Sequence, residues 1–248
     1  MFATRLEKFF DAALTLVYPQ ACVVCGQGVE SHKDGVVCEE CWQRTRIFSG
    51  AEIVCWKCGA LAEGDVDKEK RETVFCRRCG EESFDAARAV GVYEGALRAE
   101  ILRLKVEDNI SQRLSYLFFE AQKRKPLCST TRIVPVPLHK ERLKERGFNQ
   151  AAVLARSLSK LSKLPVDENS FVRAIHTEKH RSGMDAKARR DSVEGAFRVV
   201  HPRLIKDEKI LLVDDVFTTG ATTSICAKAL KEAGACKVYV LTVARPMF

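Results

Sequence analysis

The amino-acid sequence predicts an α/β protein, in which a doubly wound parallel sheet follows a small N-terminal module with two zinc sites. Two observations predict this architecture. Eight of the eleven cysteines form four Cys-x-x-Cys pairs within the first 79 residues, and beyond residue 85 apolar runs of strand length alternate with helical patterns. A chain of 248 residues is long enough for one such core and one small module. We therefore expect two domains, residues 1–84 and 85–248.

The first 17 residues carry apolar side chains at helical spacing and predict an amphipathic helix that packs on its own domain. Charged residues such as Arg5 and Lys8 interrupt this segment, so it does not resemble a secretory signal. No apolar run approaches the length of a membrane span. We therefore expect a cytoplasmic protein without a membrane span.

The paired cysteines predict two structural zinc sites. The eight residues are Cys22, Cys25, Cys38, Cys41, Cys55, Cys58, Cys76 and Cys79. Two residues between thiolates let both sulfurs bind one tetrahedral metal ion, so two pairs complete a Cys₄ site. Disulfides and thioredoxin-like redox centres are the alternatives, but cytosolic thiols stay reduced and four identical pairs exceed what a redox centre needs. Sequential pairing is favoured over interleaved pairing, although the spacing does not settle the order.

The first elements of the α/β region follow from periodicity and prolines. They are expected over 88–93 (strand), 95–105 (helix), 110–123 (helix), 131–138 (strand) and 151–164 (helix). Leu97, Ile101 and Leu104 share one face of the first of these helices. Pro135 and Pro137 end the second strand, because proline cannot donate to a central ladder. The intervening residues 139–146 are expected to form a basic turn.

The remaining elements alternate in the same way. Strands are expected over 171–175, 195–200, 210–213 and 237–243, with a helix over 224–232 and a polar loop over 176–190. Strands that alternate with helices indicate a parallel sheet, whose ligands lie beyond the carboxyl ends of its strands.

Two adjacent acids and a Thr/Gly loop occupy such a position. Asp214 and Asp215 end the strand expected from residue 210, and the next helix follows the loop. The N–H groups at a helix N-terminus bind anions, and Gly220 lets a phosphate approach closely. Two carboxylates can accept hydrogen bonds from a ribose diol or hold Mg²⁺. The segment therefore predicts a site for a ribose 5-phosphate.

This segment resembles the signature with which type I phosphoribosyltransferases bind phosphoribosyl pyrophosphate (PRPP). The resemblance implies a sheet of that kind, with Asp214 and Asp215 as the catalytic residues that hold the ribose diol. The residues implied to surround the 5-phosphate are Val216, Phe217, Thr218, Thr219, Gly220, Ala221 and Thr222. An ordinary strand end and the acidic strand of a helicase are the alternatives. The chain has no Gly-x-x-x-x-Gly-Lys-Ser/Thr loop, so the helicase alternative lacks its phosphate site.

Further motifs extend the resemblance over nearly the entire chain. In order, they are the Cys-x-x-Cys-Gly pairs, Tyr93-Glu-Gly95, Leu104-Lys105, Val134-Pro-Val-Pro137, Arg146-Gly-Phe-Asn-Gln150, Gly195-Ala-Phe197 and the acidic loop. This series is similar to that of the ComF family of competence proteins. The resemblance implies a zinc ribbon joined to a phosphoribosyltransferase-like domain, and a role in DNA uptake during natural transformation beside a helicase-like partner.

As an enzyme, such a protein would displace pyrophosphate from C1 of Mg²⁺-bound PRPP with a nitrogen nucleophile. Catalysis would come from holding the diphosphate and neutralising its charge. The candidate pyrophosphate loop contains Pro135, Val136 and Pro137, and the candidate cations are Lys105, Arg142 and Arg146. The alternative is a binding protein without turnover, either a PRPP or nucleotide sensor or a single-stranded DNA adaptor.

The positive charge of the chain is concentrated in one segment. The formal net charge is +8, and residues 139–190 contain thirteen Lys and Arg against six Asp and Glu, a net charge of +7. This segment is expected to attract polyanions, and both PRPP and single-stranded DNA fit that description.

Overall fold

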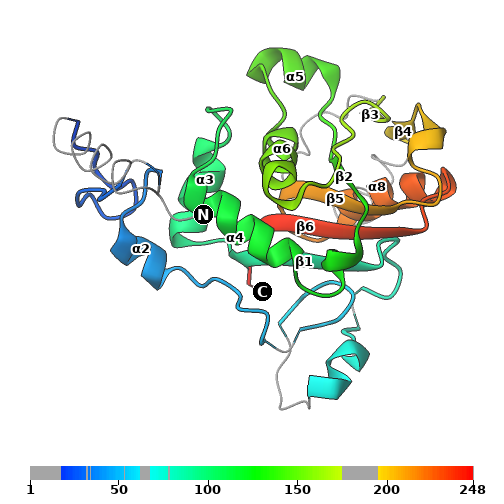
Figure 1. Ribbon diagram of the computed structural model, residues 1–248, viewed down its shortest axis with the longest axis horizontal. Helices are drawn as coiled ribbons and strands as arrows, with labels where there is room; N and C mark the ends of the chain where they lie inside the picture. The colour runs from blue at the N-terminus through cyan, green and yellow to red at the C-terminus, as the bar shows by residue number, and fades with distance from the viewer. Residues whose placement is uncertain are drawn as a thin grey trace, which may run out of the picture.

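The computed structural model describes residues 18–31, 33, 35–52, 54–61, 68–77, 79–174 and 195–247 (Figure 1). The helix predicted over residues 1–17 and the polar loop predicted over 176–190 lie outside these residues. No helix in the described part of the chain is long and apolar enough to cross a membrane.

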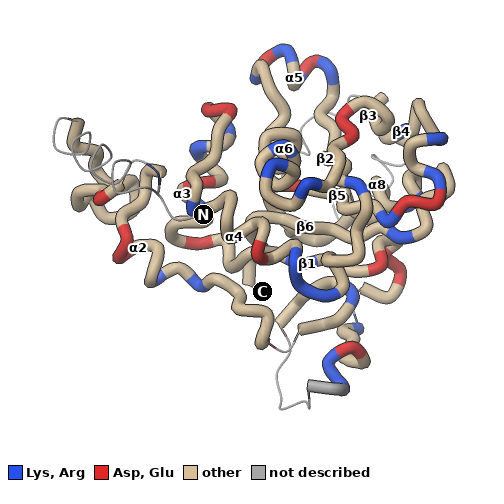
Figure 2. The backbone as a smooth tube through the Cα atoms, viewed as in Figure 1, with Lys and Arg blue, Asp and Glu red and all other residues tan. Residues whose placement is uncertain are grey.

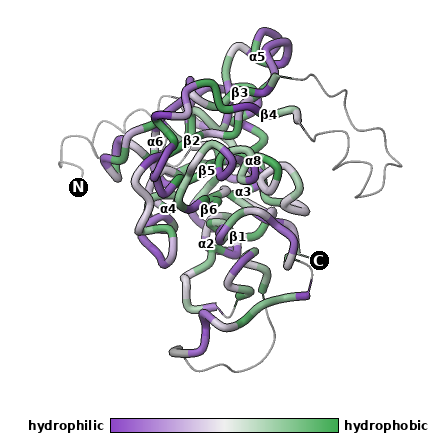
Figure 3. Tube along the Cα trace, turned by 90° about the vertical axis from the view of Figure 1, so that its right-hand side faces the viewer, coloured by the Kyte–Doolittle hydropathy of each residue, from purple (hydrophilic) through white to green (hydrophobic). Residues whose placement is uncertain are grey.

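The main sheet has four parallel strands in the order β1-β6-β5-β2. The strands are β1 (Ala86–Val92), β2 (Arg132–Pro135), β5 (Lys209–Val216) and β6 (Lys237–Arg245). Beyond β2, Ile133 pairs in parallel with Val166, which extends the sheet by a short stretch of chain. The buried middle of β5, residues 210–213, is wholly apolar because both faces of a parallel sheet are covered, and hydrophobic stretches run through the centre of the molecule in Figure 3.

Helices cover both faces of this sheet. They are α3 (Gly95–Arg103), α4 (Gln112–Gln122), α6 (Gln150–Ser162) and α8 (Ala221–Glu232). Side chains of a strand alternate between its faces, so Leu211 and Val213 pack in the core with α3, α4 and α6. Ile210 and Leu212 point the other way and pack with α8. The prediction of a doubly wound parallel sheet is therefore confirmed.

The chain leaves two neighbouring strands in opposite directions. From β2 it passes through α6 to the pairing at Val166, on the outer side of β2. From β5 it passes through α8 to β6, toward the opposite edge. The carboxyl ends of β2 and β5 therefore form a topological switch point, which is where open α/β sheets bind their ligands.

Two predictions about the elements between β2 and β5 are wrong. Residues 139–146, expected as a basic turn, contain the helix α5 (Lys140–Arg146), which ends at Gly147 with φ 83°. Its Lys, Glu and Arg residues favour a helix, and its single leucine left no apolar periodicity to detect. The strands β3 (Phe171–Arg173) and β4 (Phe197–Val199) form a separate antiparallel pair instead of joining the parallel sheet. The rings of Phe171 and Phe197 stack at 5.7 Å in that pair.

The cysteine-rich segment covers the free edge of β1. It contains α2 (Glu39–Arg44) and the short helix η2 (Lys68–Thr73). The N–H of Phe48 donates to the Val90 carbonyl at 2.8 Å, and the N–H of Val92 donates to the Arg46 carbonyl at 3.0 Å. A Cβ atom at Gly91 would lie 2.3 Å from that Arg46 carbonyl, so glycine permits this close pairing. The edge of the sheet is thereby closed to other strands.

Candidate functional site

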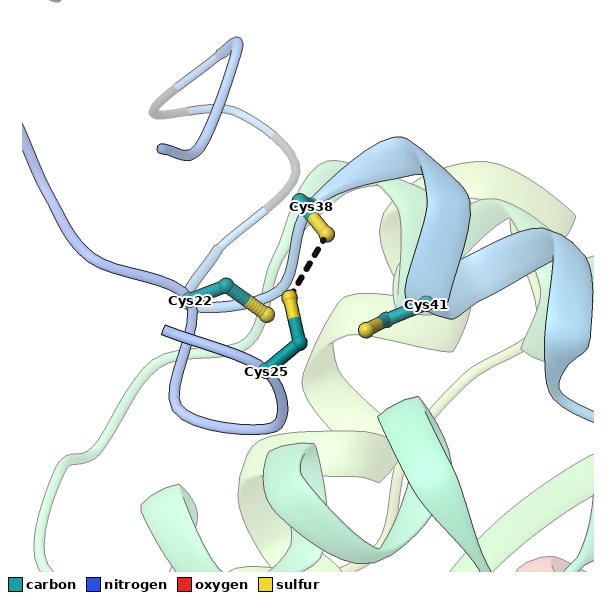
Figure 4. A group of neighbouring side chains, drawn as sticks. All are labelled: Cys22, Cys25, Cys38 and Cys41. Atoms are coloured by element: carbon teal, nitrogen blue, oxygen red, sulfur yellow. Dashed lines mark hydrogen bonds between the residues drawn. The ribbon is translucent and has the colours of Figure 1, made fainter. Parts of the chain in front are cut away.

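The first cysteine cluster joins a tight turn to the start of α2 (Figure 4). The sulfurs of Cys22, Cys25, Cys38 and Cys41 all lie within 4.8 Å of one another. Cys22 and Cys25 come from the turn, where the N–H of Gly26 donates to the Cys22 carbonyl at 2.8 Å. Cys38 precedes α2 and Cys41 lies within it. Four thiols that converge in this way form a closed tetrahedral site of the kind that suits zinc.

The second cluster repeats this arrangement with the remaining pairs. The sulfurs of Cys55, Cys58, Cys76 and Cys79 lie within 4.8 Å of one another. Two of its sulfur pairs, Cys55–Cys79 and Cys58–Cys76, are 3.4 and 3.6 Å apart. Each cluster therefore takes two consecutive pairs, which confirms sequential pairing and gives two Cys₄ zinc-binding sites.

The electrostatics of the thiols fit a metal ion. Hydrogen bonds, first from the Cys58 side chain and then from backbone N–H groups, lower the pKa of Cys55 to about 4 despite burial. Burial raises the pKa of Cys22. Hydrogen bonds from backbone N–H groups, of which that of Cys38 has the largest effect, outweigh burial and lower this pKa to about 6. Burial and neighbouring thiols instead raise the pKa of Cys79 to about 12. A cation is what allows all four thiols of one cluster to ionise together.

The acid pair lies at the carboxyl end of β5. Asp214 and Asp215 are partly buried, and each accepts a hydrogen bond from the N–H of the next residue, at 2.9 and 2.7 Å. Burial, and then the charge of Asp215, hold the pKa of Asp214 well above its usual range. Two carboxylates so close together are stabilised by a cation or by hydroxyl donors placed between them.

The loop after the acids leads directly into α8. Phe217 is buried, whereas Thr218, Thr219 and Thr222 are exposed. Gly220 has a φ of 84°, and a Cβ atom there would lie 2.8 Å from the Phe217 ring. Because α8 begins at residue 221 rather than at the predicted 224, its N-terminus directly follows this glycine. The threonine hydroxyls and the first N–H groups of α8 can therefore act together on one anion.

The candidate pyrophosphate loop adjoins the acid strand. The N–H of Val136 donates to the Val213 carbonyl at 2.9 Å, which holds Pro135–Pro137 beside the end of β5. The side chain of Asn149 donates to the Val136 carbonyl at 3.0 Å and accepts from the N–H of Ala151, so it ties this loop to the start of α6. Sequence reasoning missed this role of Asn149, although an asparagine just before a helical pattern is an N-cap signal.

The candidate cations divide into two groups. Arg142 lies on α5 near Arg173 of β3. Burial lowers the pKa of Arg173, and the positive charge of Arg142 lowers it further. Burial raises the pKa of Cys226. The charge of Asp214 raises this pKa further and the charge of Arg173 lowers it, so the three side chains lie near one another. Sequence reasoning missed Arg173, because its strand was assigned to the main sheet. Arg146 and Lys105 are exposed, and neither makes a hydrogen bond or ion pair with the acids among the described residues.

A cavity of about 100 Å³ lies elsewhere, between the cysteine-rich segment and the end of α4. Phe48, Trp56, Arg88 and Arg124 are among its lining residues. The Arg88 guanidinium stacks over the Trp56 ring at 5.0 Å. None of the candidate PRPP residues lines this cavity, so it is separate from the acid pair.

We expect the purified chain to contain about two zinc ions, because each cluster supplies a complete ligand set. Cys22→Ser or Cys55→Ser should lower the zinc content to about one equivalent and lower the melting temperature, since metal binding and folding share one free energy. Elemental analysis and thermal unfolding measure both effects. Cys128→Ser, at an exposed cysteine outside the clusters, is the control. Full zinc content in either cluster variant would contradict this assignment.

Comparisons with known proteins found a matching family model and similar solved structures. Residues 13–80 match the family model described as a double zinc ribbon domain. Among solved structures, the chain matches a glutamine PRPP amidotransferase from B. subtilis, with a TM-score of 0.34 and 16% identity over 59% of this chain and 26% of that one. It also matches a purine phosphoribosyltransferase from Pyrococcus horikoshii, with a TM-score of 0.34 and 16% identity over 54% of this chain and 81% of that one.

Relatives in sequence match over most of the chain. Competence protein F of Haemophilus influenzae is 30% identical over 90% of this chain and 96% of its own length. The DNA utilization protein YhgH of Escherichia coli K12 is 29% identical over 94% of this chain and 100% of its own. Competence protein ComFC of Bacillus subtilis is 36% identical over 41% of this chain and 39% of its own. The chain therefore belongs to the ComF family of competence proteins.

Proposed function

We propose that the chain binds PRPP, or another ribose 5-phosphate ligand, together with Mg²⁺ at the carboxyl ends of β2 and β5. One observation carries this proposal. Asp214 and Asp215 lie in the last three residues of β5 at the switch point, and Gly220 follows them at the N-terminus of a twelve-residue helix. Acceptors for a diol and donors for a phosphate thus stand one loop apart, which matches the two ends of a ribose 5-phosphate.

Each part of the site has a role in this proposal. Asp214 and Asp215 accept hydrogen bonds from the ribose hydroxyls, and the loop up to Thr222 binds the 5-phosphate. Pro135–Pro137 would hold the pyrophosphate, and Arg142, Arg146 and Lys105 are the cations proposed to neutralise its charge. Mg²⁺ would neutralise part of the diphosphate charge when bound. The raised pKa of Asp214 supports this arrangement, because burial and the charge of Asp215 disfavour its ionised form, which hydroxyl donors or a cation would stabilise.

The relatives suggest the process in which this site acts. Their names refer to competence and DNA utilization. We propose that this chain acts in DNA uptake in the cytoplasm, beside a helicase-like partner, as the family resemblance implies. As an enzyme it would transfer the phosphoribosyl group to a nitrogen nucleophile, and as a sensor it would bind PRPP without turnover. Release of pyrophosphate in a screen of acceptor bases distinguishes the two.

Binding of single-stranded DNA is a second candidate function, and α5 favours it. Figure 2 shows basic and acidic residues alternating along this protruding helix. Lys140 and Lys144 are exposed on it, next to the half-buried Arg142. Exposed cations bind a nucleic-acid backbone by releasing its counterions.

We expect Asp214→Asn and Asp215→Asn each to weaken PRPP binding about tenfold or more. A hydrogen bond to a charged group contributes about 1.5–3 kcal/mol, and about 1.4 kcal/mol corresponds to tenfold in affinity. Calorimetric titration of the full chain with PRPP and Mg²⁺ measures the effect. Asp207→Asn, at an exposed aspartate between Ile205 and β5, is the matched control. Normal binding by both acid variants would rule out the phosphoribosyl site.

The substitution Asp214→Asn should also stabilise the ligand-free protein. Because the native pKa of Asp214 is raised, the folded chain keeps a proton that the unfolded chain releases, so the free energy of unfolding falls as the pH rises through the native pKa. We expect Asp214→Asn to raise the free energy of unfolding at neutral pH, by an amount that shrinks as the pH is lowered. Urea unfolding over the pH range in which zinc stays bound measures this. A gain that grows toward low pH would contradict it.

We expect binding of single-stranded DNA to weaken as salt rises, and Lys140→Gln/Lys144→Gln to lower the slope of log K against log[salt] by about 1.4. Each phosphate contact to a single strand contributes about 0.7 to that slope. Fluorescence anisotropy with a labelled oligonucleotide at several salt concentrations measures it. Lys206→Gln/Lys209→Gln, at the opposite end of the sheet, is the control. Equal slopes in all three proteins would place the DNA surface away from α5.

A further inference from the structure

Arg245, the last residue of β6, contacts both the second cysteine cluster and the loop after the acid pair. Its Nη1 donates to the Cys58 carbonyl at 2.7 Å. The same guanidinium lies over the Phe217 ring, with its central carbon 5.4 Å from the ring centroid. One side chain therefore spans the distance between the zinc site and the floor of the phosphate loop.

The segment that follows Cys79 makes two further contacts in the same direction. The Phe84 ring meets the Phe217 ring edge-on, with 5.7 Å between centroids and 78° between planes. The N–H of Ser83 donates to the hydroxyl of Ser224 in the first turns of α8 at 2.9 Å. The chain leaving the second cluster thus holds both Phe217 and the start of α8.

Phe217 is the residue through which these contacts reach the phosphate loop. Its N–H donates to the Ala244 carbonyl at 2.9 Å, and its ring fills the space that a Cβ atom at Gly220 would need. A shift of this ring would therefore move Gly220 and the first N–H groups of α8. These groups bind the phosphate in the proposed function.

In the described part of the chain, the first cluster has a similar arginine but no such contacts to the loop. The Arg113 guanidinium lies over the Trp42 ring at 5.0 Å and pairs with Glu39. Cys22, Cys38 and Cys41 belong to the core on the α3, α4 and α6 face. Phe217 belongs instead to the core on the α8 face, together with Cys55, Cys58 and Cys79. Among the described residues, the second cluster therefore shares a packed core with Phe217, and the first cluster does not.

We propose that Arg245 is a positioning residue that couples the second zinc site to the phosphate loop, so that zinc in this site and a phosphoribosyl ligand in the loop each strengthen the binding of the other. The coupling rests on the proposed function, and linkage requires it to act in both directions. The chemistry of the cluster supports the role of the arginine. Four thiolates around Zn²⁺ leave two negative charges, and the Arg88 and Arg245 guanidiniums interact with this cluster. Loss of zinc would free the turn that carries Cys58, and with it the carbonyl that holds Arg245.

Site-resolved alkylation of the full, zinc-loaded chain tests the proposal. A zinc-selective chelator and N-ethylmaleimide are added with or without PRPP and Mg²⁺, and mass spectrometry follows the peptides that contain each cluster. We expect saturating PRPP to slow alkylation of the second cluster about fivefold or more, which is the lower range of typical coupling. The first cluster should be alkylated at an unchanged rate, and it serves as the internal control.

Arg245→Met tests the residue itself, since methionine keeps an apolar stem but offers neither the hydrogen bond nor the charge. We expect this variant to bind PRPP more weakly and to lose the protection of the second cluster. Arg113→Met removes the corresponding stacked arginine at the first cluster and should retain the protection. Calorimetry on the same samples reports PRPP binding independently of alkylation.

Two outcomes would overturn the coupling while leaving the proposed function intact. In one, PRPP binds but neither cluster is protected; in the other, both clusters are protected equally, as a general stabilisation would produce. If calorimetry shows no PRPP binding, the proposed function fails, and hydrogen exchange then decides on the coupling. Exchange of residues 217–224 should increase in Arg245→Met and after zinc removal. Unchanged exchange in both cases would overturn the inference.

Discussion

The edge of β1 is the constraint on which the rest of the structure depends. A parallel sheet with an open edge exposes a row of unpaired backbone groups, and here residues 46–48 pair with that edge. The pairing brings the cysteine-rich segment across the sheet, so that one cluster packs on each face. The two zinc sites are thus parts of the same hydrophobic cores that position the helices. The cysteine-rich segment is therefore packed into the α/β unit over both faces of the sheet.

The acid pair benefits from the same packing. Asp214 and Asp215 lie within β5, whose neighbouring strands are fixed in register on both sides, so their backbone has little freedom. In the loop that follows them, the buried Phe217 ring leaves no room for a Cβ atom at residue 220, where the chain has glycine. An acid pair and a loop held in this way would lose little conformational entropy on binding the proposed ligand.

Local signals in the sequence predicted much of this arrangement. The spacing of the cysteines predicted both zinc sites, and the apolar runs predicted the strands that carry the acids. What the sequence could not indicate depends on contacts between distant segments. Arg173 reaches the surroundings of Asp214 only because β3 leaves the parallel sheet and pairs with β4. Helix α5 escaped detection for a different reason, since a helix that buries nothing has no apolar stripe.

That absence of buried residues has a consequence for how α5 behaves. A segment opens locally with a free energy set largely by the apolar contacts it would lose, and none of the seven residues of α5 is buried. The ring of its N-cap His139 accepts a hydrogen bond from the N–H of Glu141 at 3.3 Å, and its C-terminus is a glycine turn. Fraying of this helix would therefore leave the sheet and both zinc sites undisturbed. Arg142 and Arg146 would then sample many positions, because they would lie on a flexible segment that is anchored only at its two ends.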